Sequence, residues 1–274
     1  MTGTRRGRIG FLLPVVFLAA CGPALEEVRD DEPEPPLPIE RVQPPVQEPP
    51  KEQPPEDPDL RKVTFVTPKA QPVTLRYKAE GRSIGAPNAG SLEGGRCIGA
   101  EGPGFVHFGD SGCGTVELVT LLTFCLLEVQ KEHPGTPPVV VGSLSSPGGG
   151  RLRPHKSHRS GRDVDIGFYA TRNRPMTSLQ TLSPEEIDWD KTFFLMANMI
   201  ATGKVQMIFV NYGLQPYLYE AGKRMGYDDE QLGYIIQYPR GSGNRIGVIR
   251  HARGHTRHFH VRFACPAGDS ECTD

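Results

Sequence analysis

One segment limits how much of this 274-residue chain can fold into a core. Residues 22–59 contain 12 prolines and 12 acidic side chains among 38 residues, with only three basic side chains. Proline lacks an amide donor and favours extended polyproline II geometry, so this segment cannot form a packed core. Fully extended at ~3.1 Å per residue, it would reach roughly 100 Å. We interpret it as a linker, either a chosen tether or a passive spacer, which leaves residues 60–274 for the folded part.

The first 21 residues have the pattern of an export signal. Three arginines precede the apolar stretch at residues 9–20, which is too short to span a bilayer comfortably. Leu18-Ala19-Ala20-Cys21 then resembles the lipobox of bacterial lipoproteins. The resemblance implies that residues 1–20 are a signal peptide, cleaved before a lipidated Cys21. The alternatives are an ordinary signal peptide cut nearby or a weak membrane helix.

The residue after this cysteine bears on the destination of the protein. The residue after Cys21 is Gly22 and not aspartate. In this respect the chain is similar to lipoproteins that are sorted to the outer membrane in enteric-type bacteria. We therefore expect a periplasmic protein that is lipid-anchored in the outer membrane. Residues 21–59 would then be the lipidated cysteine and its linker.

The remaining 215 residues, 60–274, suffice for one sizeable core and are expected to form a single catalytic domain. The chain carries a net charge of −1, of which the leader contributes +3 and the linker −9, so the folded part carries +5. A modest positive excess favours an anionic partner without identifying it. No nucleic-acid motif is present, and no nucleic-acid partner is expected.

Five cysteines remain after Cys21, and export to an oxidising compartment permits disulfides among them. The odd number leaves at least one thiol unpaired within the chain. Cys125 lies in an apolar, helix-like run, where a buried thiol packs as a small hydrophobic group. We predict that two short loops are closed, although spacing alone leaves other pairings open. The predicted pairs are Cys265 with Cys272 and Cys97 with Cys113.

The hydrophobic pattern predicts a mixture of strands and helices without a regular βαβ rhythm. This favours an α+β fold in which helices and long loops flank a small antiparallel β-sheet. Ser183-Pro184-Glu185-Glu186 is a capping box that opens a helix, with or without a break near Asp190. The other expected helices cover residues 115–130, 214–225 and 229–238, and the expected strands cover 138–142, 163–169, 205–210 and 257–264.

Residues 163–169 alternate with period two, which predicts a half-buried strand. Val164, Ile166 and Phe168 would face the core, while Asp163 and Asp165 would point the other way. We expect Asp163 to be structural and Asp165 to be a candidate metal ligand.

Six of the eight histidines fall into two clusters, one at positions 155 and 158 and one at positions 251, 255, 258 and 260. In a strand, His258-Phe259-His260 places both imidazoles on one face. His158, Asp165 and His260 would together offer zinc two nitrogens and one carboxylate oxygen, with a fourth position open. Such a site activates water and polarises a carbonyl, which indicates hydrolysis.

Simpler interpretations exist for each part of this pattern. A His-x-His pair is more often a solvated strand face than a metal site, and a histidine-rich patch can merely store metal. The joint pattern favours a site because both halves fall on strand-like segments.

Two motifs resemble a known family. HKSHRSGRDVDI at 155–166, preceded by GGR at 149–151, resembles the signature of penicillin-insensitive murein endopeptidases. HTRHFHVR at 255–262 resembles their second motif, and the end of the chain, residues 265–272, is similar to their short disulfide loop. The resemblance spans roughly residues 80–274.

This resemblance implies a fold shared with lysostaphin-type peptidases, D-alanyl-D-alanine metallopeptidases and the hedgehog signalling domain. The implied reaction is zinc-dependent hydrolysis of the D-alanyl–meso-diaminopimelyl cross-link in peptidoglycan. Carried over by position, His158, Asp165 and His260 would hold one Zn²⁺ per chain. A second metal is not supported by the residues between Asp165 and Val205.

The resemblance also assigns roles to the other histidines. His258 would be the catalytic histidine, His255 would assist as proton donor or stabiliser, and His155 would line the site. The expected partners are peptidoglycan and, through the lipid, a membrane.

Two rival functions stay open. A D-Ala carboxypeptidase or dipeptidase of the same fold usually has a glutamate near the last histidine ligand, but residues 254–260 contain no acid. A non-catalytic peptidoglycan-binding lipoprotein would not need His158, Asp165, His258 and His260 intact.

Overall fold

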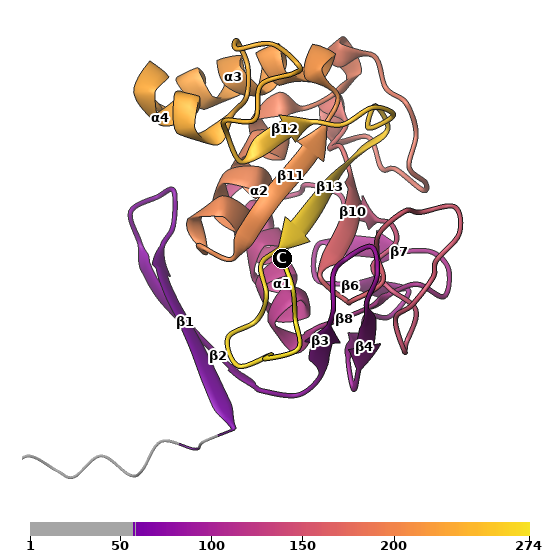
Figure 1. Ribbon diagram of the computed structural model, residues 1–274. Helices are drawn as coiled ribbons and strands as arrows, with labels where there is room; N and C mark the ends of the chain where they lie inside the picture. Colours follow the sequence, from indigo (N-terminus) through magenta and orange to yellow (C-terminus); the bar gives the residue numbers. More distant parts are fainter. Residues whose placement is uncertain (1–56, 58) are drawn as a thin grey trace, which may run out of the picture. The chain divides into compact units, whose positions relative to one another are not determined.

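The computed structural model describes residue 57 and residues 59–274 (Figure 1). The predicted signal peptide, Cys21 and nearly all of the linker lie outside these described residues. The described part has the α+β architecture that the sequence predicted. None of its helices has both the length and the apolar character needed to cross a bilayer.

A seven-stranded sheet forms the centre of the fold, in the order β12-β11-β13-β10-β9-β7-β6 (Figure 1). The last strand in sequence, β13, pairs antiparallel with β10 on one side and β11 on the other. The pairs β11–β12 and β7–β9 are parallel, so the expected antiparallel sheet is mixed towards its edges. The strands are β6 (Glu101–Gly102), β7 (Phe105–His107), β9 (Val139–Val141), β10 (Asp163–Gly167), β11 (Val205–Val210), β12 (Ile249–His251) and β13 (His258–Phe263).

Three two-stranded sheets, which the sequence did not predict, precede or flank the centre. They pair β1 (Leu60–Val66) with β2 (Pro72–Lys78), β3 (Arg82–Ile84) with β4 (Ser91–Glu93), and β5 (Arg96–Cys97) with β8 (Cys113–Gly114).

Both predicted disulfides are present. Cys97 and Cys113 face each other across the β5–β8 pair, and Cys265 bonds to Cys272. Cys125 is a buried free cysteine, as predicted, and burial raises the pKa of its thiol. It packs as a small hydrophobic group in the middle of α1.

Local capping signals explain where the helices begin. Thr115 caps α1 by accepting a hydrogen bond from the Leu118 amide at 3.2 Å, and Asp188 caps α2 through the Lys191 amide at 3.1 Å. The capping box at Ser183 opens only a 3₁₀ turn, Pro184–Glu186, before α2 starts. The helices are α1 (Val116–Glu132), α2 (Trp189–Ala201), α3 (Gln215–Arg224) and α4 (Asp229–Ile235), with further 3₁₀ turns at Thr171–Asn173 and Tyr212–Leu214.

One face of the central sheet packs into the core with α1 and α2. Val164 and Ile166 of β10 and Phe259 and Val261 of β13 are fully buried in the same apolar cluster as Phe193 of α2. Each such side chain contributes on the order of 1.5–3 kcal/mol through burial. The apolar half of the period-two pattern therefore fixes the sheet against the helices, and the polar half lies on the other face.

The prediction that β10 is half-buried is wrong. All five of its residues are buried, and Asp163 and Asp165 are only 1% and 2% exposed. The polar face is covered by side chains of β13 and by the loop that carries His158, so it is buried among polar groups instead of solvated.

Candidate metal centre

Strand pairing brings the two sequence motifs together. In the β10–β13 register, Asp165 lies opposite His260 and Asp163 lies opposite Arg262. Because side chains alternate along a strand, all four lie on the same face of the sheet. His258 pairs with Gly167 on the same register and joins this face. The shared face thus carries both halves of the site.

The loop before β10 holds His158 in an unusual conformation. Its φ of 65° is left-handed, which costs a residue with a Cβ about 1–2 kcal/mol. Three contacts offset this strain: the His158 amide donates to Asp163 Oδ2 at 2.8 Å, its carbonyl accepts from Ser145 Oγ at 2.6 Å, and its Nδ1 lies 2.7 Å from the Leu144 carbonyl oxygen. Strain maintained in this way is typical of functional positions.

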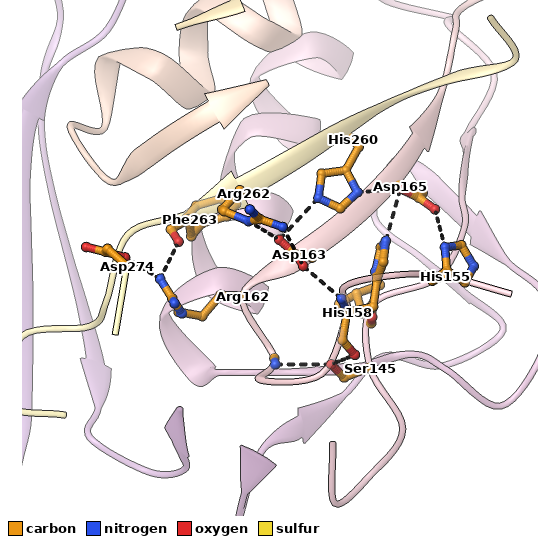
Figure 2. A network of polar contacts seen from close by, with 12 residues as sticks. Ser145, His155, His158, Arg162, Asp163, Asp165, His260, Arg262, Phe263 and Asp274 are labelled. Atoms are coloured by element: carbon orange, nitrogen blue, oxygen red, sulfur yellow. Dashed lines mark hydrogen bonds and ion pairs between the residues drawn. The ribbon is translucent and has the colours of Figure 1, made fainter. Parts of the chain in front are cut away.

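The Asp165 carboxylate is surrounded by imidazole nitrogens (Figure 2). Its Oδ1 lies 2.9 Å from His260 Nδ1, 3.3 Å from His158 Nε2 and 3.5 Å from His258 Nε2. Its Oδ2 lies 3.6 Å from His155 Nδ1. These histidine contacts hold the pKa of Asp165 well below its usual value, although burial alone would raise it.

The donor set fits a divalent metal. His158 Nδ1 faces a carbonyl oxygen, so this nitrogen carries the proton and, in the neutral ring, Nε2 presents a lone pair to Asp165. A lone pair and a carboxylate facing each other at 3.3 Å favour a cation between them. His155, His158 and Asp165 each offer a ligand atom within 4.8 Å of the others, so this group contains His155 and not the predicted ligand His260. Two nitrogens and one oxygen are typical ligands of zinc.

His260 lies between two aspartates. Its Nδ1 contacts Asp165, and its Nε2 lies 3.1 Å from Asp163 Oδ1. Burial lowers the pKa of His260, but hydrogen bonding and attraction to both carboxylates outweigh burial and raise it to about 9. A metal at Asp165 would replace the proton on Nδ1 and leave the Nε2 proton for Asp163.

Asp163 connects the two halves of the site. Its carboxylate accepts from Arg262 Nε at 2.8 Å and from the His158 amide, so it contacts the elements that carry both predicted histidine ligands (Figure 2). Arg262 in turn lies over the Phe209 ring at 5.6 Å. The spacing Asp-x-Asp signalled that Asp163 shares a face with Asp165, but only the register reveals its partners.

The two predicted catalytic histidines lie beside this centre. The rings of His255 and His258 are 5.1 Å apart, and burial lowers the pKa of both, to about 4 for His258. His258 is therefore neutral at neutral pH and can accept a proton. Among the described residues, His258 Nδ1 has no hydrogen-bond partner within the protein, so this atom is available to another group.

A cleft of about 620 Å³ opens over these side chains. It is lined by every site residue that the sequence predicted, namely His155, His158, Asp165, His255, His258 and His260. His251, which belongs to the second histidine cluster, lies outside the cleft lining. Its Nδ1 accepts a hydrogen bond from the Tyr212 amide at 3.0 Å, so it fixes the turn after β11.

The chain is similar to several known proteins. A family model described as "Penicillin-insensitive murein endopeptidase" matches residues 83–215, a range that includes the first motif and ends before the second. A protein of that name from Klebsiella pneumoniae subsp. pneumoniae is 29% identical over 228 residues, covering 74% of each chain. Proteins of the same name from Yersinia enterocolitica and Haemophilus influenzae are 29% and 30% identical, over 54% and 50% of this chain and about half of their own lengths, 52% and 47%.

The chain is therefore similar to the penicillin-insensitive murein endopeptidase family. This similarity indicates a peptide hydrolase, and the family name points to murein as the polymer on which its members act.

Proposed function

We propose that this protein is a zinc-dependent endopeptidase that hydrolyses D-alanyl–meso-diaminopimelyl cross-links in peptidoglycan. The observation that carries the proposal is the Asp165 carboxylate, which four imidazole nitrogens approach within 3.6 Å at the base of a cleft. Similarity to the penicillin-insensitive murein endopeptidases supports the choice of murein as substrate.

His158, Asp165 and His260 are the proposed zinc ligands. When bound, zinc would supply a Lewis acid that polarises the scissile carbonyl and activates water. His158 is presented by its strained loop, and His260 is oriented by Asp163, as outer-shell carboxylates commonly orient metal-binding histidines. Hydrogen bonds of this chain therefore set His158 in place, and an ion-pair contact with Asp163 positions His260.

His258 is proposed to move the proton. It is neutral at neutral pH, borders Asp165, and has an Nδ1 without a partner inside the described protein. These properties suit a group that accepts a proton from the attacking water and returns it to the leaving amine. His255, whose ring is tilted against that of His258 in the cleft lining, would donate a hydrogen bond to the developing oxyanion.

The two rival functions predict different products. Purified sacculi should lose their cross-linked dimers on incubation with the protein, and a chelator should prevent that loss until zinc is restored. Release of free D-alanine would identify a carboxypeptidase. Tight pelleting with sacculi whose muropeptides stay unchanged would identify a non-catalytic binding protein and contradict the proposal.

The proposed ligand set predicts that three histidine variants differ in zinc binding and turnover. His260→Ala should abolish stoichiometric zinc binding, because it removes the ligand closest to Asp165. His258→Ala should retain most of the zinc and lose turnover. His155→Ala should retain zinc as well, because His155 lies farthest from Asp165 among the four.

The measurement is zinc content by elemental analysis beside the rate of dimer cleavage. Zinc loss in His155→Ala with retention in His260→Ala would replace His260 by His155 in the ligand set. Equal loss in His258→Ala and His260→Ala would refute the division of roles.

A further inference from the structure

The two segments that carry the histidines of the site are rich in basic residues and lack acidic ones. Residues 143–162 contain five arginines or lysines and residues 239–262 contain six, and neither segment has an aspartate or glutamate. Among the described residues, the only acidic side chains that line the cleft are Asp165 and Asp274. Asp274 is paired with the buried Arg162, and Asp165 faces the imidazoles.

Three cations of the cleft are left without an acidic partner. Lys156 lies on one wall, and Arg253 and Arg257 lie on the β12–β13 loop that forms another. All three are exposed, and none has an ion pair within the part of the chain that the structure describes. Arg262 also lines the cleft, but its guanidinium is hydrogen-bonded to Asp163. We call Lys156, Arg253 and Arg257 the cationic rim.

Some exposed cations outside the cleft face carboxylates, for example Lys223 with Asp229 at 2.7 Å and Arg224 with Asp190 at 2.6 Å. Three like charges around one concave site repel one another and concentrate the field there, which attracts an anionic ligand. Guanidinium groups in particular bind carboxylates through two parallel hydrogen bonds.

The proposed substrate has a carboxylate next to the bond that is cut. In a diaminopimelyl cross-link, the carbon attached to the scissile nitrogen also bears a free carboxylate, whereas the corresponding carbon of lysine bears only hydrogens. We infer that Arg253 and Arg257, assisted by Lys156, bind this carboxylate and so select diaminopimelate over lysine or amidated diaminopimelate on the amine side. This inference rests on the proposed endopeptidase function and deepens it.

Three matched cross-linked dimers test the inference, one with free diaminopimelate, one with amidated diaminopimelate and one with lysine at the amine side. The wild type should cleave the free form at least about tenfold faster in kcat/KM, since a charge-assisted hydrogen bond of ~1.5–3 kcal/mol gives a factor of about 10–100. Arg253→Gln and Arg257→Gln should raise KM for this dimer by about tenfold with little change in kcat, and should bring the preference close to one. Lys156→Gln should act in the same direction but more weakly.

Arg224→Gln and Lys223→Gln are the controls, because these exposed cations lie outside the cleft. Both should leave KM and the preference unchanged. Equal cleavage of the three dimers by the wild type, or an unchanged preference in Arg253→Gln and Arg257→Gln, would overturn the inference.

Binding of the amine-side product separates this outcome from a failure of the proposed function. Calorimetry should show tighter binding of the diaminopimelyl peptide than of its amidated form, and the rim variants should abolish the difference. If the wild type cleaves no dimer, the proposed function fails, and this binding comparison alone decides whether the rim recognises the carboxylate. Equal binding of the two peptides would then refute it.

Discussion

Asp163 shows how a single side chain can organise a site without entering its chemistry. Its two oxygens reach the amide of His158, the ring of His260 and the guanidinium of Arg262. Burial alone would raise its pKa, but His260 and Arg262 hold it well below the usual value. The carboxylate is therefore a fixed negative charge that positions a residue from each half of the site.

Asp163→Asn should weaken zinc binding by about 10–100-fold, the range typical for removal of an outer-shell partner. The amide can still accept a hydrogen bond from His158, but it no longer stabilises charge on His260 and Arg262. Competition with a chromogenic chelator measures the affinity. Asp229→Asn, an exposed aspartate paired with Lys223, should retain wild-type affinity. A wild-type zinc affinity in Asp163→Asn would show that Asp163 does not position His260.

The contacts between these side chains could not be predicted from the sequence, because they depend on the register between strands. Side chains alternate between the two faces along a strand, and this local property predicted that Asp165 shares a face with Asp163 and that His258 shares a face with His260. Which residue of β10 lies opposite which residue of β13 depends on pairing across 95 positions, and no local pattern encodes it. The same holds for the Leu144 carbonyl that fixes the His158 tautomer.

At the scale of elements, the capping box at Ser183 forms as the sequence predicted, but it does not open the long helix that was expected there. The box is formed, with Glu186 accepting from the Ser183 amide at 3.0 Å, yet the helix stops after one turn. Ile187 adopts an extended conformation because it bridges to Ala170, and the Asp188 amide donates to the Tyr169 carbonyl. Tertiary pairing therefore displaced the start of α2 to Trp189.

The β1–β2 hairpin precedes the residues matched by the family model and is held to the domain by one apolar face. Phe65 is buried and its ring meets Phe124 of α1 edge-on at 5.5 Å. Phe65→Ala should therefore lower the free energy of unfolding by about 3 kcal/mol. Chemical denaturation measures this change.

The neighbouring Val66 is the matched control, since its side chain is 58% exposed on the opposite face. Val66→Ala should change the free energy of unfolding by less than about 0.5 kcal/mol. Equal effects of the two substitutions would mean that the hairpin is not anchored through Phe65.

At the scale of the whole molecule, charge is divided between the parts of the chain. The proline-rich segment carries −9 and the folded part +5, and 11 of the 25 basic residues of the folded part lie in the two segments around the cleft. We propose that the acidic segment tethers the domain to a lipid on Cys21 at the periplasmic face of the outer membrane.

This tether predicts that the wild type incorporates labelled palmitate in a lipoprotein-processing bacterium and sediments with membranes. Cys21→Ser should lose both properties, because the thiol is the site of lipid attachment. Cys125→Ser is the control, since its thiol is buried in α1, and it should be labelled normally. Sedimentation of an unlabelled Cys21→Ser protein with membranes would point to an uncleaved membrane anchor.

The position of β13 has a consequence for how the protein folds during its synthesis. This strand is the last of the sheet to be synthesised, yet it occupies a central place between β10 and β11. A nascent or prematurely terminated chain that lacks residues 258–263 has β10 and β11 with no partner between them, and it lacks both His258 and His260. The proposed hydrolytic site is therefore complete only after β13 has been synthesised, so fragments of the protein that end before His258 should leave murein uncut.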